Sequence, residues 1–125
     1  MNKAKKVILW FFVVSVLVVG SLYAYTLNVE AENWEKIRFY YGITCTHCKE
    51  VEAFMEERNA SSFLKIEMKE IYENIENAKE MRMRAQKCEL QTNQVGVPFI
   101  YFEGKCYVGK IEAENLITKE LEKVK

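Results

Sequence analysis

The feature that most constrains this 125-residue chain is an uncharged apolar run close to its N-terminus. Residues 7–25 read VILWFFVVSVLVVGSLYAY. At a rise of about 1.5 Å per residue they form about 28 Å of helix, close to the hydrocarbon thickness of a bilayer. A buried amphipathic helix is the alternative, but Ser15, Gly20 and Ser21 form no continuous polar stripe. The sequence therefore predicts a transmembrane helix over residues 7–27.

A cleaved signal peptide is the other reading of this segment. Signal peptides have an apolar region of about 7–15 residues that ends at a small-residue cleavage site. The run here is longer, and the nearest suitable triplet, residues 29–31, lies several residues beyond it. We therefore expect an uncleaved anchor.

The charges that flank this run predict its orientation. Lys3, Lys5 and Lys6 crowd residues 1–6, whereas the other flank begins with glutamates. Because basic flanks stay in the cytoplasm, we expect a cytoplasmic basic tail over residues 1–6 and an extracytoplasmic C-terminal body in a single-pass membrane protein. A cleaved signal peptide gives the same compartment. The body is expected to consist of a linker over residues 28–33 and one domain over residues 34–125.

The charged residues exclude several functions. The chain has 18 basic and 18 acidic residues, and every acidic residue is a glutamate. This balance gives no basic patch, so we expect no nucleic-acid partner. The lack of aspartate argues against catalytic aspartate pairs and calcium loops of the EF-hand type.

The body shows alternating strand and helix patterns. Strands are predicted over residues 37–41, 63–69, 97–102 and 106–108, and helices over residues 46–58, 70–88 and 112–123. The order is β-α-β-α-β-β-α, which predicts an α/β fold: a four-stranded mixed sheet with helices on both faces. In the second helix we expect an apolar stripe that includes Ile71, Ile75 and Cys88, and in the last helix we expect Val124 to point inward.

Cys45-Thr46-His47-Cys48 lies where the first predicted strand ends and a helix begins. The unpaired N–H groups and the macrodipole at a helix N-terminus favour a thiolate, which is the nucleophile of disulfide exchange. Cys45 is the expected exposed attacker, and Cys48, one turn further and on the apolar side, is the expected resolving thiol. His47, the only histidine, adds positive charge beside Cys45 when it is protonated; the alternative is a solvated loop histidine.

A metal site is the alternative for these cysteines. One C-x-x-C supplies two ligands, whereas structural zinc takes four, and Cys88 and Cys106 lack a second C-x-x-C spacing. Haem attachment needs a histidine after Cys48, where Lys49 stands. We therefore expect no metal. A purely structural Cys45–Cys48 disulfide is another alternative, although such a short loop adds little stability.

Pro98 is the only proline in the chain and begins a predicted strand. Because central strands tolerate proline poorly, this position indicates either a special geometry such as a cis bond or an ordinary strand-start proline.

The strand, the C-x-x-C that opens a helix, the Val97-Pro98 hairpin and the final helix together resemble the thioredoxin superfamily over residues 34–125, with the compact form of glutaredoxin-like members. The resemblance implies a cis Pro98 beside the cysteines, main-chain pairing of Val97 with the substrate, and Thr46 facing the substrate. Histidine in the third position of the motif is similar to DsbA-type and protein disulfide isomerase-type sites, which are oxidants or isomerases.

The family's buried aspartate on the strand before the motif is replaced here by Phe39, so Glu52 is the remaining candidate to accept the proton of Cys48. The resemblance is the only indication of glutathione, and no other cofactor is expected.

Cys88 and Cys106 are either buried, inert thiols or a disulfide pair. Free thiols are uncommon in an oxidising compartment, so we expect a disulfide, worth about 3 kcal/mol in the chain-entropy model.

The leading hypothesis is a membrane-tethered thiol–disulfide oxidoreductase that acts on extracytoplasmic proteins. Cys45 attacks, a mixed disulfide forms and Cys48 resolves it. The alternatives are a tethered electron relay that reduces one dedicated partner, and a non-catalytic binding module with a structural C-x-x-C. A membrane redox partner is also expected as an option.

Overall fold

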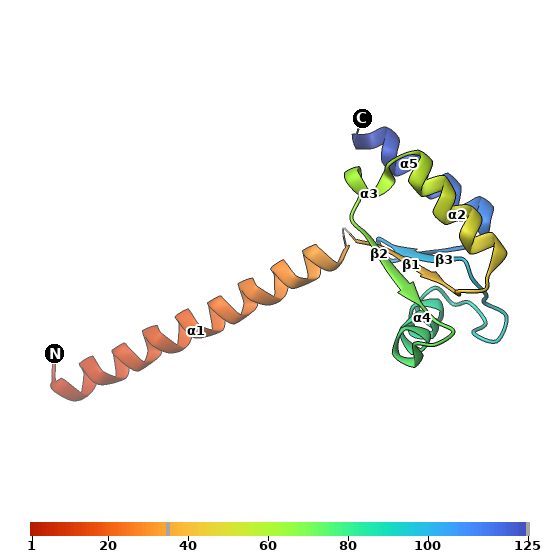
Figure 1. Cartoon of the computed structure of the whole chain (residues 1–125). Coiled ribbons are helices and arrows are strands. Elements are labelled where there is room, and N and C mark those ends of the chain that lie inside the picture. The colour runs from red at the N-terminus through yellow and green to blue at the C-terminus, as the bar shows by residue number, and fades with distance from the viewer. Residues whose placement is uncertain (35, 125) are drawn as a thin grey trace. The chain divides into compact units, whose positions relative to one another are not determined.

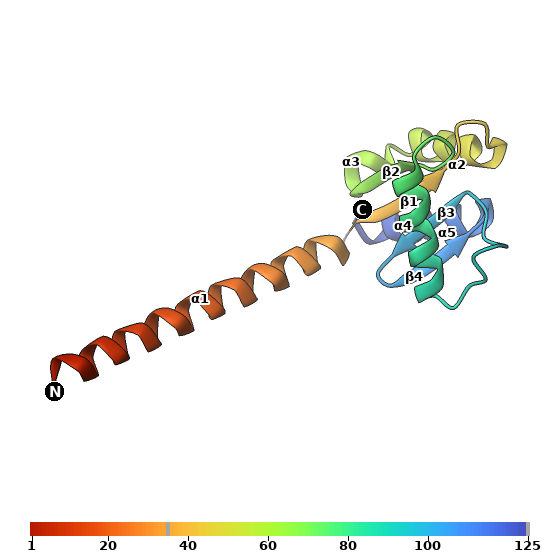
Figure 2. The ribbon, with the colours of Figure 1, turned by 90° about the horizontal axis from the view of Figure 1, so that it is seen from below.

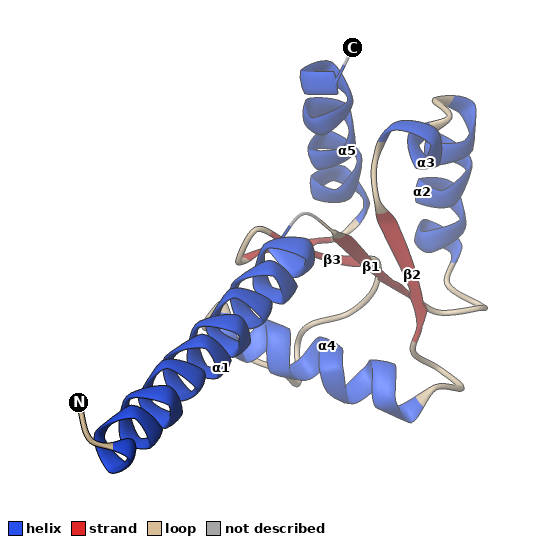
Figure 3. Cartoon of the chain, turned by 90° about the vertical axis from the view of Figure 1, so that its left-hand side faces the viewer, coloured by secondary structure: helices blue, strands red, loops and turns tan. Residues whose placement is uncertain are grey.

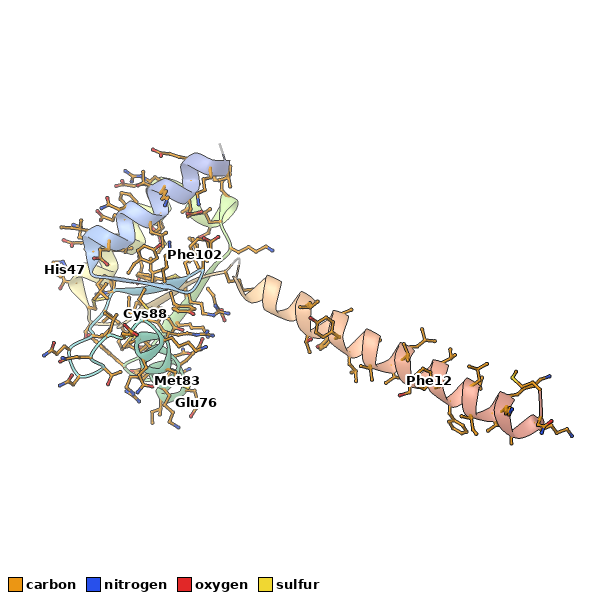
Figure 4. The ribbon with its side chains drawn as sticks, turned by 180° about the vertical axis from the view of Figure 1, so that it is seen from behind. Phe12, His47, Glu76, Met83, Cys88 and Phe102 are labelled. Atoms are coloured by element: carbon orange, nitrogen blue, oxygen red, sulfur yellow. A yellow bond between two sulfur atoms is a disulfide. The ribbon has the colours of Figure 1, made fainter. Side chains whose placement is uncertain are left out.

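The structure, a computed structural model, describes residues 1–34 and 36–124, and the chain divides into two compact units, Met1–Asn33 and Trp34–Lys125. Helix α1 (Lys3–Trp34) forms the first unit and continues through residues 28–33, the expected linker, which is therefore helical. Its stretch Lys3–Leu27 is long and apolar enough to cross a bilayer, and none of it is buried. Phe12, for example, projects from the helix into open space (Figure 4).

The second unit is a mixed four-stranded α/β domain. Its elements in chain order are β1 (Ile37–Tyr41), α2 (Thr46–Glu57), α3 (Ala60–Phe63), β2 (Ile66–Glu70), α4 (Ile75–Lys87), β3 (Phe99–Phe102), β4 (Lys105–Val108) and α5 (Lys110–Val124). The strand order is β2-β1-β3-β4; β1 is parallel to β2, whereas β3 is antiparallel to both β1 and β4. Helices α2, α3 and α5 cover one face of the sheet and α4 covers the other (Figures 1 and 3).

The alternation of side chains along β1 and β3 builds a core on each face of the sheet. Ile37 and Phe39 of β1 join Ile100 and Phe102 of β3 under α2 and α5. Tyr40 faces the other way and packs with Phe99, Tyr101 and residues of α4. Because β1 and β3 lie in the middle of the sheet and are covered on both sides, nearly every residue in them is buried.

The β3–β4 hairpin has the two-residue loop Glu103-Gly104, since Phe102 pairs with Lys105. Both loop residues have positive φ, at 48° and 75°. Such a loop matches the twist of the flanking strands, and glycine adopts this backbone conformation without strain.

Several boundaries differ from the sequence predictions. The strand predicted over residues 63–69 begins only at Ile66, because residues 60–63 form the short helix α3. The helix predicted from residue 70 begins at Ile75, with Asn74 as its N-cap: the Asn74 side chain accepts a hydrogen bond from the N–H of Asn77. Ile75 is consequently in the first turn and 67% exposed, and Val124 is 51% exposed at the end of α5. The prediction that Ile75 and Val124 join the core is therefore wrong.

A charged network lies between α4 and the sheet, where α4 crosses the strands (Figure 2). The Glu80 carboxylate of α4 accepts hydrogen bonds from the Tyr40 hydroxyl at 3.0 Å and from Lys69 Nζ at 2.8 Å. The guanidinium of Arg38, a side chain only 6% exposed, lies 3.6 Å from the same carboxylate. Desolvation raises the pKa of Glu80, but the hydrogen bonds from Lys69 and Tyr40 outweigh it and lower the pKa below its usual value.

Replacing Glu80 tests how far this network stabilises the domain. Glu80→Ala should lower the free energy of unfolding by about 1–3 kcal/mol, because it removes the acceptor of the buried Tyr40 hydroxyl and leaves Arg38 with the more exposed carboxylate of Glu67. Since the folded-state pKa of Glu80 is lowered, its contribution is complete above the ordinary carboxyl pKa and disappears as the pH falls through the folded value. Urea unfolding of the full chain in detergent, followed by circular dichroism at several pH values, measures both effects.

The matched control is Glu76→Ala on the same helix. Glu76 forms an exposed ion pair with Lys79 and should contribute less than about 0.5 kcal/mol. Equal effects of the two substitutions at neutral pH would contradict a stabilising role for Glu80.

Candidate redox site

Cys45 and Cys48 form a disulfide at the start of α2. Cys45 is the N-cap residue, with extended φ and ψ of −80° and 111°, and its Sγ accepts a hydrogen bond from the N–H of Cys48 at 3.1 Å. This sulfur therefore occupies the position where a capping oxygen usually accepts from the first helical turn. Cys45 is half-buried, whereas Cys48 is fully buried in the core under α2. Of the two cysteines, only Cys45 is partly accessible to solvent.

The loop before β3 reaches the same sulfur from the other side. The Val97 carbonyl oxygen lies 3.7 Å from Cys45 Sγ, although the two residues are 52 positions apart. The Val97–Pro98 peptide bond is cis, and Pro98 is buried. The Pro98 carbonyl accepts a hydrogen bond from the N–H of Gly109 at 2.8 Å, which ties this loop to the start of α5. The structure thus brings Val97 and Pro98 to Cys45, while Thr46 is exposed as the first residue of α2.

His47 is exposed at the periphery of the domain, in contrast to Phe102 in the interior (Figure 4). Its Nδ1 lies 2.9 Å from a Glu50 carboxylate oxygen, and Lys110 Nζ lies 3.1 Å from the same oxygen. Hydrogen bonds from His47 and then from Lys110 lower the pKa of Glu50 below its usual value. The sequence analysis did not identify Glu50 and Lys110. The spacing of three residues between His47 and Glu50 indicates their pairing, but the approach of Lys110 depends on the fold.

The turn before Cys45 is held by the loop that follows β2. The Cys45 N–H donates to the Gly42 carbonyl at 3.0 Å, closing the turn, and the Tyr72 ring lies directly against Gly42 where a Cβ would otherwise stand. The Glu70 carboxylate accepts hydrogen bonds from the backbone N–H groups of Tyr72, Glu73 and Asn74 in that loop. Sequence reasoning missed Glu70, because nothing in its local pattern distinguishes it from the other glutamates.

Two further residues named by the sequence lie close to the pair along the chain. Phe39 is fully buried in the same core cluster as Cys48. Glu52, one helical turn after Cys48, is half-buried; desolvation and then the neighbouring Glu56 carboxylate raise its pKa. A carboxylate with a raised pKa is a better proton acceptor, so Glu52 remains a candidate for that role.

Cys88 and Cys106 form the second disulfide, which confirms the expected pairing. Cys88 is the C-cap of α4 and Cys106 lies on β4, so the bond ties the end of the helix to the edge of the sheet. Both residues pack against the core on the α4 face, whereas Cys45 and Cys48 belong to the core on the opposite face. The two disulfides therefore lie on opposite faces of the sheet.

The fold and the cysteine pair define a class of protein. Its members have an α/β domain with a C-x-x-C disulfide at a helix N-terminus, in a chain with one N-terminal helix able to span a membrane. Neither the models of known protein families nor the curated proteins include a match to this chain. Within residues 1–34 and 36–124, no three His, Cys, Asp or Glu side chains gather in a way that could hold a metal ion. The chemistry of the cysteine pair therefore follows from its own geometry.

Removal of the second disulfide should affect stability and leave the first pair unchanged. Cys88→Ala/Cys106→Ala should lower the free energy of unfolding by about 3 kcal/mol, because it releases a loop that constrains the unfolded chain. The equilibrium of the Cys45–Cys48 pair with glutathione should not change, since the two disulfides lie on opposite faces of the sheet.

Urea unfolding and redox titration of the same protein measure the two quantities. Tryptic digestion without reduction checks the pairing, because residues 88–105 and 106–110 should appear as one linked product. A shift of the first equilibrium in the double variant would contradict the independence of the two pairs.

Proposed function

We propose that this chain is a membrane-tethered thiol–disulfide oxidoreductase of the thioredoxin superfamily, which exchanges disulfides with extracytoplasmic proteins. The observation that carries the proposal is the position of Cys45 Sγ, which accepts the Cys48 N–H at the N-terminus of α2 and lies 3.7 Å from the carbonyl oxygen of Val97. The element order of the domain, which is β-α-β-α-β-β-α with the short helix α3 added after α2, the strand order β2-β1-β3-β4 and the cis Val97–Pro98 bond support the family assignment.

The exchange proceeds by two thiolate attacks. A partner thiolate attacks Cys45 Sγ, breaks the Cys45–Cys48 bond and forms a mixed disulfide, and Cys48 leaves as a thiolate that takes up a proton. A second partner thiolate then attacks the partner's own sulfur and releases Cys45. The partner loses two electrons and two protons, which the cysteine pair gains. In the reverse direction, Cys45 attacks a partner disulfide and Cys48 resolves the mixed disulfide.

The surroundings of Cys45 favour oxidation of the partner. The helix N-terminus and the Cys48 N–H both stabilise a thiolate at Cys45, and His47 adds positive charge when it is protonated. Stabilising the thiolate stabilises the reduced pair, so the disulfide becomes a stronger oxidant. A potential of about −120 mV, as in DsbA, would support this direction, whereas about −270 mV, as in thioredoxin, would support the alternative of a reducing relay.

The N-terminal helix supplies the anchor in this proposal. A helix long and apolar enough to span the membrane, preceded by Lys3, Lys5 and Lys6, supports a position of the catalytic domain outside the cytoplasm under the positive-inside tendency. The partners are thiol or disulfide proteins of that compartment, including membrane redox proteins. The cysteine pair carries the electrons itself, so the reaction needs no bound cofactor.

The substitution Cys48→Ser tests the exchange chemistry. Without the resolving thiol, mixed disulfides between Cys45 and partner proteins should accumulate in cells, because their breakdown depends on the second sulfur. Non-reducing gels of cells that produce the full chain should show new high-mass species that disappear on reduction. Cys45→Ser is the matched control and should give none, because buried Cys48 is inaccessible to proteins. If the two variants behave alike, the C-x-x-C is structural and the chain is a binding module.

Labelling of intact cells tests the orientation. After mild reduction, a membrane-impermeant maleimide should modify the tryptic peptide of residues 39–49, which contains both Cys45 and Cys48. A cysteine introduced into the basic tail by Asn2→Cys should react only after the membrane is opened. The opposite pattern would place the domain in the cytoplasm and contradict the proposed compartment.

A further inference from the structure

We propose that Glu70 is a positioning residue of the redox site, which holds Cys45 in its helix-capping geometry and thereby sets how readily the Cys45–Cys48 pair is reduced. This inference rests on the proposed function, since it concerns the same cysteine pair. It assigns a role to the β2–α4 loop, a segment that contributes no group to the exchange itself.

The first observation is the number of backbone groups that one carboxylate holds. Glu70 is the last residue of β2, and its carboxylate accepts the N–H groups of Tyr72 at 2.6 Å, Glu73 at 2.8 Å and Asn74 at 3.2 Å. The N–H of Ile43, in the separate loop before α2, also faces this carboxylate and contributes to lowering its pKa. Desolvation raises the pKa of Glu70, but the backbone N–H groups around the carboxylate outweigh it and lower the pKa below its usual value. The carboxylate is therefore ionised at neutral pH.

The second observation is that Ile43 lies inside the turn that ends at Cys45. The turn is closed by the hydrogen bond from the Cys45 N–H to the Gly42 carbonyl. Cys45 is the next residue but one after Ile43, and its extended φ and ψ place Sγ where it accepts the Cys48 N–H. A loose turn would let Cys45 leave this conformation, and a thiolate at Cys45 would lose that hydrogen bond.

The third observation is that the two loops also touch through side chains. The Tyr72 ring occupies the place that a Cβ on Gly42 would take, and the Ile71 N–H donates to the Tyr41 carbonyl at 2.9 Å. The Glu70 carboxylate is the group that holds the loop of residues 71–74 in the shape that presents Tyr72 to Gly42. The two loops therefore pack against each other next to Cys45, and together they hold its position.

If Glu70 positions Cys45, its replacement shifts the reduction equilibrium of the Cys45–Cys48 pair in one direction. If Glu70 acts only through its charge, the shift has the opposite sign. If Glu70 acted only through its negative charge, removing that charge would stabilise the Cys45 thiolate and make the pair easier to reduce. If Glu70 acts by positioning, its loss weakens the capping of the thiolate and makes the pair harder to reduce. The sign of the shift thus separates the two roles.

Three variants of the full chain in detergent provide the test: Glu70→Gln, Glu70→Asp and Glu73→Gln. Glu70→Gln removes the charge and part of the accepting capacity, whereas Glu70→Asp keeps the charge but shortens the side chain by one methylene. Glu73→Gln is the matched control, because it removes one negative charge from an exposed side chain of the same loop.

Each protein is equilibrated with glutathione, so that two glutathione thiols are oxidised to one glutathione disulfide while the Cys45–Cys48 bond takes up two electrons and two protons. Mass spectrometry of the alkylated peptide of residues 39–49 gives the reduced fraction separately from the Cys88–Cys106 pair. We expect Glu70→Gln and Glu70→Asp each to lower the equilibrium constant for reduction about tenfold, or about 30 mV for a two-electron couple. Glu73→Gln should leave the constant unchanged or raise it slightly.

The rate of Cys45 alkylation across pH is the second readout. It should show a higher thiol pKa for Cys45 in both Glu70 variants, while circular dichroism confirms that the domain is folded. A shift in Glu70→Gln toward easier reduction, or no shift in Glu70→Asp, would overturn the positioning role. If the wild-type pair does not equilibrate with glutathione at all, the proposed function fails instead, which is a distinct result.

Discussion

The structure depends on the pairing of β1 with a parallel strand on one side and an antiparallel strand on the other. Because β1 and β2 run in the same direction and β3 runs in the opposite one, the ends of β1 and β2 and the beginning of β3 lie at one edge of the sheet. Each contributes one loop to that edge: the turn into Cys45, the loop after Glu70, and the cis Val97–Pro98 segment. The redox site is the place where these three loops meet.

The alternation of β1 separates the chemistry of the two faces. Phe39 and Cys48 belong to an apolar core on the side of α2, so the second cysteine of the pair lies in a nonpolar environment. Arg38 and Tyr40 point to the side of α4 and meet Glu80 there. Burying a charge without a partner is costly, so the position of α4 on the sheet is constrained by these polar contacts as well as by apolar packing.

The sequence predicted the parts of the structure that depend on local patterns. Strand periodicity located β1 and the hairpin, and the C-x-x-C spacing located the site. The wrong prediction for Ile75 has a local cause. Ile75 was expected in the core because it fits a helical stripe, but the Glu70 carboxylate binds the N–H groups of the following residues and delays the helix to the Asn74 cap. A side chain that competes for backbone hydrogen bonds in this way changes a boundary without changing the apolar pattern.

The surroundings of Cys45 show the same limit. His47 could be identified because it stands inside the motif, and its partner Glu50 follows at helical spacing. Lys110 reaches Glu50 only because Gly109, at a φ of 88°, turns the chain from β4 into α5 beside Pro98. Contacts of this kind depend on the tertiary structure, so neither composition nor periodicity indicates them.

The placement of the two disulfides prevents exchange between them within one molecule. Cys48 is fully buried, so in the oxidised state an incoming thiolate reaches the first pair only through Cys45. Exchange between the pairs would need a Cys45 thiolate to attack Cys88 or Cys106, which pack on the opposite face of the sheet. Thiolate attack requires direct approach to a sulfur, and the sheet stands between them. Within one molecule the two pairs therefore stay separate, and the second holds α4 against β4 in either redox state of the first.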